Sequence, residues 1–293
     1  MASFRIVSFN IRLDKREPDV DDSWAGERRD NVALFLQELG ADLIGLQEVK
    51  PSQLSFLADA LSSEYAHVGF GREKGKEGEA SPLFYRKSRF EVVRWQQFWL
   101  SETPEVVDSK FEGAGCTRVV TCVHLKQTDG IQLFAFNTHL DHLTTGGTFA
   151  IQAGQASILT RLIDDFCGAE THPRVIVGDF NSPRTLGAPP TLLSAGYNEC
   201  SAGDDTATFV DFDDTLASSG AINHIDWIFI RDMMCCSYSV LHGKYVHSNG
   251  QKRRNLSDHL AISARLRLPG AATASPCSTP SIHHISSLLT RPS

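Results

Sequence analysis

The chain begins with the alternation of a strand and then changes to the spacing of a helix. In residues 4–12, apolar side chains fall on both faces of an extended chain, which predicts a buried strand. Residues 23–40 carry apolar side chains at helical spacing and end at Gly40, a residue type common just after a helix. A second strand over residues 41–49 and a second helix that begins at Pro51 follow. The first part of the chain is therefore predicted to alternate strand, helix, strand, helix.

Beyond the second helix, one strand follows another with only short segments between them. These strands are predicted over residues 65–71, 81–87, 89–99, 117–125 and 131–142. Because no helix separates them, we expect them to pair mainly antiparallel. A helix and four more strands are predicted over residues 148–167, 174–181, 224–230, 237–247 and 259–268. The pattern predicts an α+β fold, or a mixed layered α/β fold, with helices packed outside the sheets.

The composition predicts where the folded domain ends and in which cellular compartment the protein lies. After Leu268 the chain is rich in Pro, Ser, Thr and Ala without periodicity, so we predict one domain over residues 1–268 and an unpacked tail over residues 269–293. Seven Cys without a CxxC pair predict reduced thiols and neither disulfides nor a zinc site. No apolar run approaches the ~18 residues that span a bilayer, and no signal peptide is recognisable. We therefore predict no membrane span and a cytoplasmic location, and leave the oligomeric state open.

The charge balance bears on the partners. The 28 Lys and Arg residues face 35 Asp and Glu residues, for a formal net charge of −7. Proteins that track duplex phosphates carry a basic footprint, and the one tight basic cluster here, residues 251–255, is expected to be a solvated loop. Acidic stretches at residues 19–22 and 211–214 would repel a long polyanion if they lined the mouth of a site. Duplex nucleic acid is thus disfavoured as a partner, without being excluded.

Polar side chains stand where several predicted strands begin or end. In VIVGDFNSP, residues 175–183, Asp179 and Asn181 would share one face of the strand while Phe180 points into the core. The pair either caps an Asx turn or presents a carboxylate and a carboxamide to a ligand. Similar positions are occupied by Asn10, Glu48, His139, Asp141, Asp226, Asp258 and His259.

The chemistry of these residues together is more informative than any one of them. Carboxylate and carboxamide oxygens suit a hard cation such as Mg²⁺, and they come from Asn10, Glu48, Asp179, Asn181 and Asp258. The imidazoles of His139 and His259 suit proton transfer or contact with an anionic oxygen. No Ser or Cys stands beside a His and an acid in a recognisable nucleophile pattern. Metal-assisted attack of water on a phosphate ester is the chemistry that this set can support.

Six short segments add a family resemblance, in the order SFNIR, GLQEV, NTHLDH, GDFN, HIDWIF and SDHLAI. Together they resemble the endonuclease/exonuclease/phosphatase superfamily, and the resemblance covers residues 4–268. It implies a two-sheet β-sandwich flanked by helices. It also implies phosphate ester hydrolysis with Mg²⁺ as the cofactor and Mn²⁺ as a substitute.

The resemblance assigns the metal and the attacking water to four residues. Glu48 matches the direct metal ligand, and Asn10 and Asp258 match residues close to the metal, partly through water. Asp179 matches the residue that orients or deprotonates the attacking water. Asp258 and His259 are adjacent and would face opposite ways in a strand, so we expect both to lie in a loop.

The resemblance assigns contacts with the phosphate to a second group of residues. Asn181 matches the residue that holds a non-bridging phosphate oxygen. His259 matches the histidine on the scissile phosphate, and Asp226 matches the carboxylate that fixes its ring. His139 matches the position that stabilises the charged phosphoryl group or assists the leaving group.

Three further residues are candidates for the substrate side. Asp141 and His142 extend the histidine motif, and Arg28 follows the first strand where a substrate loop is expected. Arg28 has an equal alternative as part of a solvated helix face.

The sequence therefore predicts a Mg²⁺-dependent phosphoesterase that prefers a small phosphorylated metabolite or a short phosphodiester. The alternative among enzymes is an endo- or exonuclease that acts on DNA or RNA. The alternative from another class is a catalytically silent binding protein with the same fold. Substrate identity, monoester against diester chemistry and the number of metal ions are not predicted.

Overall fold

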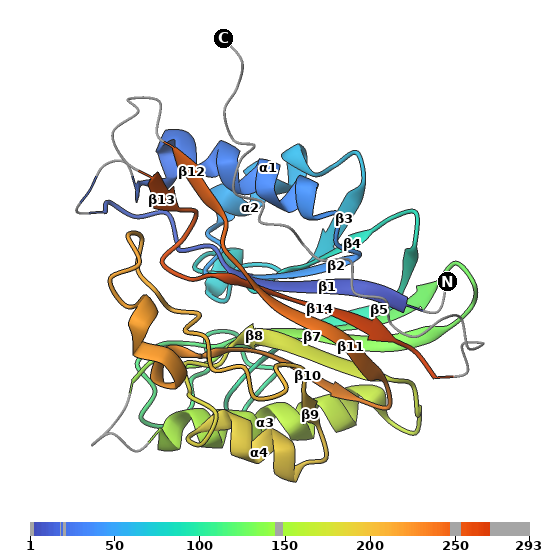
Figure 1. The fold of residues 1–293 in the computed structure, drawn as a ribbon. Coiled ribbons are helices and arrows are strands. Elements are labelled where there is room, and N and C mark those ends of the chain that lie inside the picture. Colours follow the sequence, from blue (N-terminus) through green and yellow to red (C-terminus); the bar gives the residue numbers. More distant parts are fainter. Residues whose placement is uncertain (1–2, 18, 20–21, 144–148, 247–252, 270–293) are drawn as a thin grey trace.

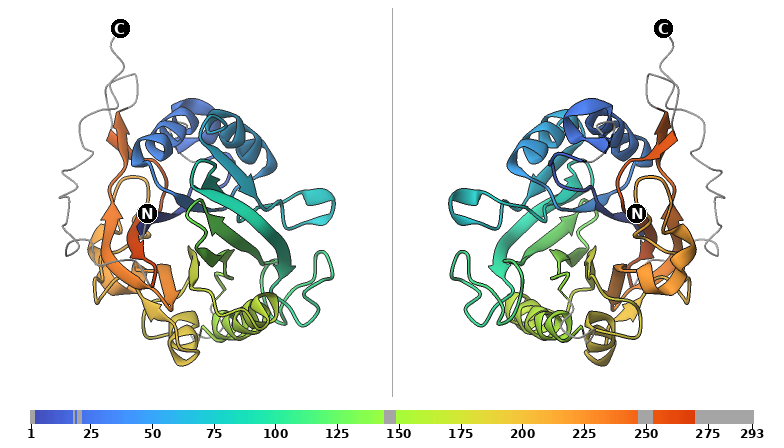
Figure 2. Two further views of the ribbon diagram at one scale, coloured as in Figure 1. Left: turned by 90° about the vertical axis from the view of Figure 1, so that its right-hand side faces the viewer. Right: turned by 90° about the vertical axis from the view of Figure 1, so that its left-hand side faces the viewer.

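The computed structural model describes residues 3–17, 19, 22–143, 149–246 and 253–269. Two six-stranded sheets pack face to face, with helices on the outer surface of each (Figure 1). The views at right angles show the same order of layers, with helices on the outer side of each sheet (Figure 2). The predicted α+β fold with a two-sheet β-sandwich is therefore confirmed.

The first sheet carries α1 (Arg29–Leu39) and α2 (Pro51–Ala60) on its outer face. Its strand order is β11 (Met234–Leu241), β14 (Ala261–Arg267), β1 (Ser3–Asn10), β2 (Leu43–Gln47), β4 (Leu83–Arg86), β3 (Tyr65–Val68). The strands β1 and β2 are parallel, and the other pairs are antiparallel. Gly40 ends α1 in the left-handed region, at φ 56°, as predicted for a helix C-terminus.

The second sheet carries α3 (Ala150–Cys167) and α4 (Ala188–Ser194) on its outer face. Its strand order is β5 (Phe90–Trp99), β6 (Val119–Gln127), β7 (Gln132–His139), β8 (Arg174–Asp179), β10 (Asp226–Arg231), β9 (Asn198–Glu199). Only β7 and β8 are parallel in this sheet. A separate hairpin joins β12 (Lys244–Val246) to β13 (Arg253–Asn255). Short helical turns lie at Trp24–Arg28, Lys74–Lys76 and Ala217–Asn223.

Two predictions about elements need correction. The predicted strand over residues 237–247 is divided between β11 and β12, because the chain leaves the first sheet after Leu241. The helix α4 and the two-residue strand β9 were not predicted, since both are too short to show a period. The tail predicted over residues 269–293 stays a prediction, because residues 270–293 lie outside the described residues.

Alternation along each strand decides which side chains reach the space between the sheets. In β1, Phe4 and Ile6 pack between the sheets, whereas Val7 and Phe9 pack against the helices. The inner face is apolar along most of its length and becomes polar toward one end. There, Gln47 Nε2 donates to Asn137 Oδ1 at 2.7 Å, and Asn137 Nδ2 donates to the backbone oxygens of Leu46 and Pro82 at 2.8 Å each. This paired polar layer supports the site described below.

Gly45 allows the two sheets to approach closely at that layer. A Cβ atom at this position would lie 2.5 Å from Val177 Cγ2 and 2.9 Å from Asn137 Cγ. Any larger residue would therefore push β2 away from β7 and β8. In the part of the chain that the structure describes, no helix is both long and apolar enough to cross a membrane.

Candidate active site

Three neighbouring strands of the second sheet carry polar residues at the same end of the sheet. The register pairs His139 of β7 with Asp179 of β8, and Asp179 with Asp226 of β10. Asn10 ends β1 in the facing sheet, on the same face of that strand as Phe4 and Ile6. The site therefore forms where polar strand ends of the two sheets meet.

Loops contribute the other predicted residues. Glu48 and Asn181 follow β2 and β8 with positive φ angles of 61° and 47°, a backbone conformation uncommon for residues other than glycine. At Glu48 this turn breaks the strand alternation that would otherwise place the side chain on the outer face with Leu46. Asp258 and His259 precede β14 in a loop, as predicted from their adjacency.

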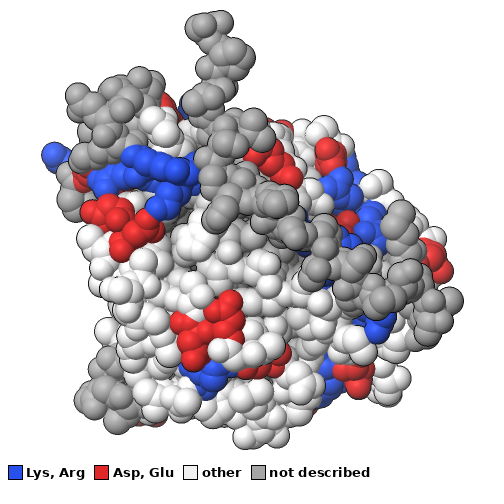
Figure 3. All heavy atoms as spheres, in the orientation of Figure 1, with Lys and Arg blue, Asp and Glu red and all other residues white. Residues whose placement is uncertain are grey.

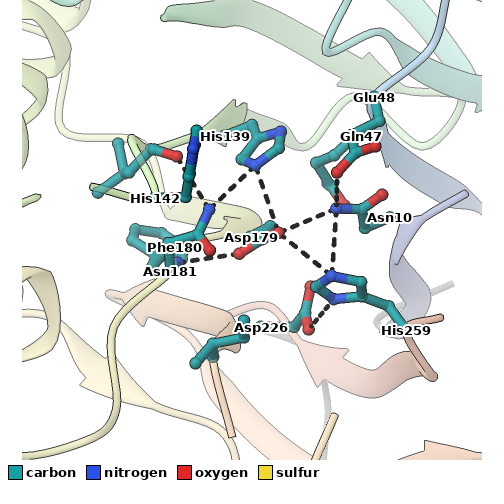
Figure 4. Close-up of polar contacts among 12 residues, drawn as sticks. Asn10, Gln47, Glu48, His139, His142, Asp179, Phe180, Asn181, Asp226 and His259 are labelled. Carbon is teal, nitrogen blue, oxygen red and sulfur yellow. Dashed lines mark hydrogen bonds and ion pairs between the residues drawn. The ribbon is translucent and has the colours of Figure 1, made fainter. Parts of the chain in front are cut away.

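Asp179 lies at the centre of the site (Figure 4). Its Oδ2 accepts a hydrogen bond of 2.9 Å from Asn10 Nδ2, and its Oδ1 accepts one of 2.9 Å from the Asn181 amide. The Nε2 atoms of His139 and His259 lie 3.4 and 3.7 Å from Oδ2. Burial, and then the nearby charge of Asp226, raise the pKa of Asp179 to about 7. Asp179 is thus poised to gain or lose a proton near neutral pH.

Glu48 is an anion at the edge of the pocket. It accepts 3.0 Å hydrogen bonds from Asn10 Nδ2 and from the Leu13 amide, one on each carboxylate oxygen. Burial alone would raise the pKa of Glu48, but these two hydrogen bonds and the charges of His259 and Arg12 lower it below the usual value. Each oxygen keeps a lone pair that no hydrogen bond from the described residues uses.

His259 is held as a cation between two carboxylates. Its Nδ1 donates to Asp226 Oδ2 at 2.9 Å, and its Nε2 faces Asp179. Burial would lower the pKa of His259, but the charges of Asp226 and Asp179 outweigh it and raise the pKa to about 10. The ring is thus charged and fixed in orientation at neutral pH.

His139 has the opposite electrostatic state. Burial and then the positive charges of Arg118 and Arg72 hold the pKa of His139 well below its usual range. The neutral ring accepts a hydrogen bond of 3.1 Å from Asn181 Nδ2 at Nε2. The site therefore combines one charged and one neutral histidine on opposite sides of Asp179 (Figure 4).

The residues predicted to lie near a metal ion offer oxygen donors that fit Mg²⁺. Glu48 is anionic and partly exposed to the pocket, and Asp258 also lines the pocket. Burial raises the pKa of Asp258, while the charges of His259 and Arg12 offset part of that effect. Arg12 NH1 lies 2.9 Å from Asp258 Oδ2. Asn10 turns its amide nitrogen toward Glu48, and its oxygen accepts the Arg12 amide at 3.0 Å. Glu48 is therefore the donor best placed to bind a metal ion directly.

A second group with metal-ligand chemistry consists of His124, Glu170 and His172, which do not line this pocket. The guanidinium of Arg94 lies 3.0 Å from His124 Nδ1 and 2.7 Å from Glu170 Oε1. A cation already balances this group, so it is a weaker metal candidate.

The site opens into a pocket of about 520 Å³. It contains several residues that the sequence did not single out, namely Arg12, Leu13, Lys15, Arg72, Glu79, Cys116, Arg118, Phe209 and Ile225. Arg12 belongs to the segment SFNIR, so its place in that motif was an available signal. Arg118 lies just before β6, and the apolar start of that strand was the only hint in its case.

Two of the three substrate-side candidates do not line the pocket. Arg28 is fully buried and donates to the backbone oxygens of Ile11 at 2.7 Å and Leu256 at 3.3 Å. Asp141 is also fully buried, and its oxygens accept the amides of Leu143 and Cys116. Both side chains therefore hold loops together. Neither is placed to contact substrate.

His142, the third candidate, is exposed and lines the pocket. Its Nδ1 lies 3.2 Å from Arg118 NH2. His142 remains a substrate-side prediction.

The acidic stretches near residues 19–22 and 211–214 do not line the pocket where the structure describes them. Arg254 NH2 lies 2.5 Å from Asp19 Oδ2 and 3.0 Å from Asp22 Oδ2. Arg254 NH1 lies 3.8 Å from Asp213 Oδ2. Acidic and basic side chains accordingly lie beside each other near β12 and β13 (Figure 3). Arg254 of the predicted basic loop lies in β13 and is buried. Repulsion of a polyanion by these acids therefore finds no support in the structure.

Comparison with known proteins agrees with this geometry. The sequence profile of the Endonuclease/Exonuclease/phosphatase family matches residues 7–259. A protein of this family from Bacteroides thetaiotaomicron is 28% identical, with a TM-score of 0.81, over 91% of this chain and 95% of its own. A family protein from Bacteroides vulgatus is 30% identical, with a TM-score of 0.79. The match covers 92% of this chain and 100% of the Bacteroides vulgatus chain.

A third solved structure carries an activity in its name. The mannosyl-6-phosphatase of Bacteroides thetaiotaomicron is 28% identical, with a TM-score of 0.79, over 90% of this chain and 99% of its own. Among curated proteins, none is similar enough to count as a relative.

Proposed function

This chain belongs to the endonuclease/exonuclease/phosphatase family of hydrolases, and from that premise we propose that it hydrolyses a phosphate ester with Mg²⁺. The single observation that carries the proposal is Asp179, a carboxylate with a raised pKa between a cationic and a neutral histidine. Such a group can accept a proton from water near neutral pH. No other pocket residue combines this position with this pKa.

We assign the protein groups the following work. Asp179 orients the attacking water and accepts its proton. The His259 cation, fixed by Asp226, faces a phosphate oxygen. Asn181 would give another phosphate oxygen one of the two Nδ2 hydrogens that His139 Nε2 and the Leu140 backbone oxygen accept in this structure. His139, which is neutral, supports the phosphate on the far side of Asp179. A Mg²⁺ ion held by Glu48, with Asn10 and Asp258 nearby, would offset negative charge on the phosphate.

The preferred substrate is a small phosphorylated metabolite or a short phosphodiester. A pocket of about 520 Å³ is in the range of small-molecule sites. The mannosyl-6-phosphatase neighbour, at 28% identity, favours a small phosphate ester. A nuclease remains the alternative enzyme, because four basic side chains line the pocket, namely Arg12, Lys15, Arg72 and Arg118.

The substrate class is tested by measuring kcat/KM with Mg²⁺ at moderate salt on a single panel. The panel holds sugar phosphates, nucleotides, short RNA and DNA, inositol phosphates, sphingomyelin and plasmid DNA. We expect a small phosphate ester to be hydrolysed most efficiently. Efficient cutting of plasmid DNA with every small ester untouched would replace the proposal by the nuclease alternative. Binding without any turnover would favour a catalytically silent protein.

The pH dependence of the reaction should reveal the His259 cation. Turnover is expected to fall as pH rises through the pKa of His259, near 10, because the cation is lost above it. Asp226→Asn keeps an acceptor for Nδ1 but removes the charge that most strongly raises this pKa. The alkaline limb of kcat/KM should then move about one to three pH units lower. Asp59→Asn, an exposed change on α2, serves as the control.

An alkaline limb that stays in place in Asp226→Asn would remove His259 from this role. A parallel shift in Asp59→Asn would point to overall charge instead of the local pair.

A further inference from the structure

Arg118 is a buried cation of the pocket without a carboxylate in contact among the described residues. It lies just before β6, is 3% exposed and lines the pocket. Its NH2 lies 3.2 Å from His142 Nδ1, whereas Nε and NH1 are buried and have no hydrogen-bond partner among the described residues. A guanidinium taken out of water without a counter-charge is costly to the fold. An anionic ligand in the pocket would offset that cost.

The neighbouring charged groups already have their partners. Arg72 NH1 and NH2 each donate to one oxygen of Glu79 at 3.0 Å, so that pair is balanced. Asp141, the acid closest in sequence to His142, accepts backbone amides with both oxygens. The charge of Arg118 helps to lower the pKa of Asp141, so the two groups act on each other electrostatically, but among the described residues no carboxylate contacts Arg118.

Arg118 lies on the side of the site away from His259. Its charge contributes to the lowered pKa of His139, and its partner His142 lies on the same side of Asp179 as His139 and Asn181 (Figure 4). A phosphate placed against His139 and Asn181 would therefore have His259 on one side and Arg118 on the other.

We propose, on the basis of the function proposed above, that Arg118 binds the additional terminal oxygen of a phosphomonoester and so selects monoesters over diesters. A monoester phosphate carries about −1.5 to −2 charges at neutral pH and three terminal oxygens. A diester has one charge fewer and puts an uncharged ester arm in place of one oxygen. The two unpartnered donors of Arg118, Nε and NH1, suit the additional charged oxygen.

The first test measures binding of inorganic phosphate and of dimethyl phosphate by calorimetry, without metal, to the wild type and Arg118→Met. The wild type should bind phosphate more tightly. Arg118→Met should weaken phosphate binding by about 10- to 100-fold and change dimethyl phosphate binding little, since charged hydrogen bonds are lost only with phosphate. Lys15→Met removes an exposed charge from the same pocket and should weaken both ligands slightly and equally.

Equal losses for the two ligands, a Lys15→Met effect as large as that of Arg118→Met, or a wild type that binds no phosphate would each overturn the proposal. Arg118→Lys, which keeps the charge but loses the guanidinium fork, should restore part of the phosphate affinity.

A second measurement separates binding from a structural role. If Arg118 serves a ligand, Arg118→Met should melt at the same or a higher temperature in phosphate-free buffer, because an unpaired buried charge has been removed. A fall of several degrees would assign Arg118 to the fold and overturn the proposal.

The two proposals can fail separately. With p-nitrophenyl phosphate and its methyl ester as matched substrates, Arg118→Met should lose kcat/KM mainly on the monoester. A wild type that binds phosphate through Arg118 but hydrolyses neither ester would refute the proposed function and leave the Arg118 site standing.

Discussion

Glu48→Gln is expected to lower Mg²⁺-dependent turnover by roughly 10³-fold, which corresponds to the several kcal/mol that a metal ion contributes to phosphate chemistry. Glu48 is the anionic donor at the pocket, with its pKa lowered and one lone pair free on each oxygen. Glutamine keeps the shape and one of the two hydrogen bonds, so the fold should survive. What it removes is the negative charge that a divalent cation requires.

The measurement is turnover as a function of Mg²⁺ concentration, together with Mn²⁺ binding followed by electron paramagnetic resonance. Glu48→Gln should lose both. Glu79→Gln is the matched control, since Glu79 lines the same pocket but gives both oxygens to Arg72. Turnover of Glu48→Gln close to that of the wild type at low Mg²⁺ would refute the assignment of Glu48.

Asp179→Asn is expected to lower kcat by about 10²- to 10³-fold with little change in KM, because the attacking water loses its proton acceptor while the phosphate contacts remain. Asp179 is buried, and its carboxylate lies beside that of Asp226, which makes its ionised form costly to the fold. The variant should therefore be at least as stable as the wild type. A residue needed only for folding would give the opposite result.

Kinetics and thermal unfolding of two variants distinguish a base from a metal ligand. Asp258→Asn should recover activity at high Mg²⁺, because the substitution lowers the affinity for Mg²⁺ and a higher concentration compensates for that loss. Asp179→Asn should not recover at any Mg²⁺ concentration. Recovery of Asp179→Asn, or an effect confined to KM, would show that Asp179 has a different role.

Alternation along strands predicted where some side chains of the candidate site lie. Period two predicted that Asp179 and Asn181 share a face with Phe180 in the core. Both polar side chains do line the pocket, although β8 ends at Asp179 and Asn181 follows it in a loop with a positive φ. The Asx-type hydrogen bond from the Asn181 amide to Asp179 is present as well, so the two readings of that segment hold together.

The same rule could not place residues whose position depends on a loop. Alternation would put Glu48 on the outer face, and only its positive φ turns it to the pocket. Alternation would also give Asp141 the face of His139, but the strand ends at His139 and Asp141 turns inward to accept two amides. Local pattern does not contain these backbone conformations.

Long-range contacts decided the remaining cases. Arg28 and Arg29 are adjacent and alike in sequence, yet Arg28 is fully buried among backbone oxygens brought from residues 11 and 256, whereas Arg29 is exposed. Arg118 reaches the pocket because β6 pairs with β7 beside His139. Neither environment exists until the sheets have formed.

The central claim is that one water, activated by Asp179, attacks phosphorus. It is tested most directly by a single turnover of the best ester of the panel in ¹⁸O-enriched water, with enzyme in excess and Mg²⁺ present. Each released phosphate should contain one solvent oxygen, and the alcohol should contain none. Label in the alcohol, or unlabelled phosphate in the first turnover, would contradict it.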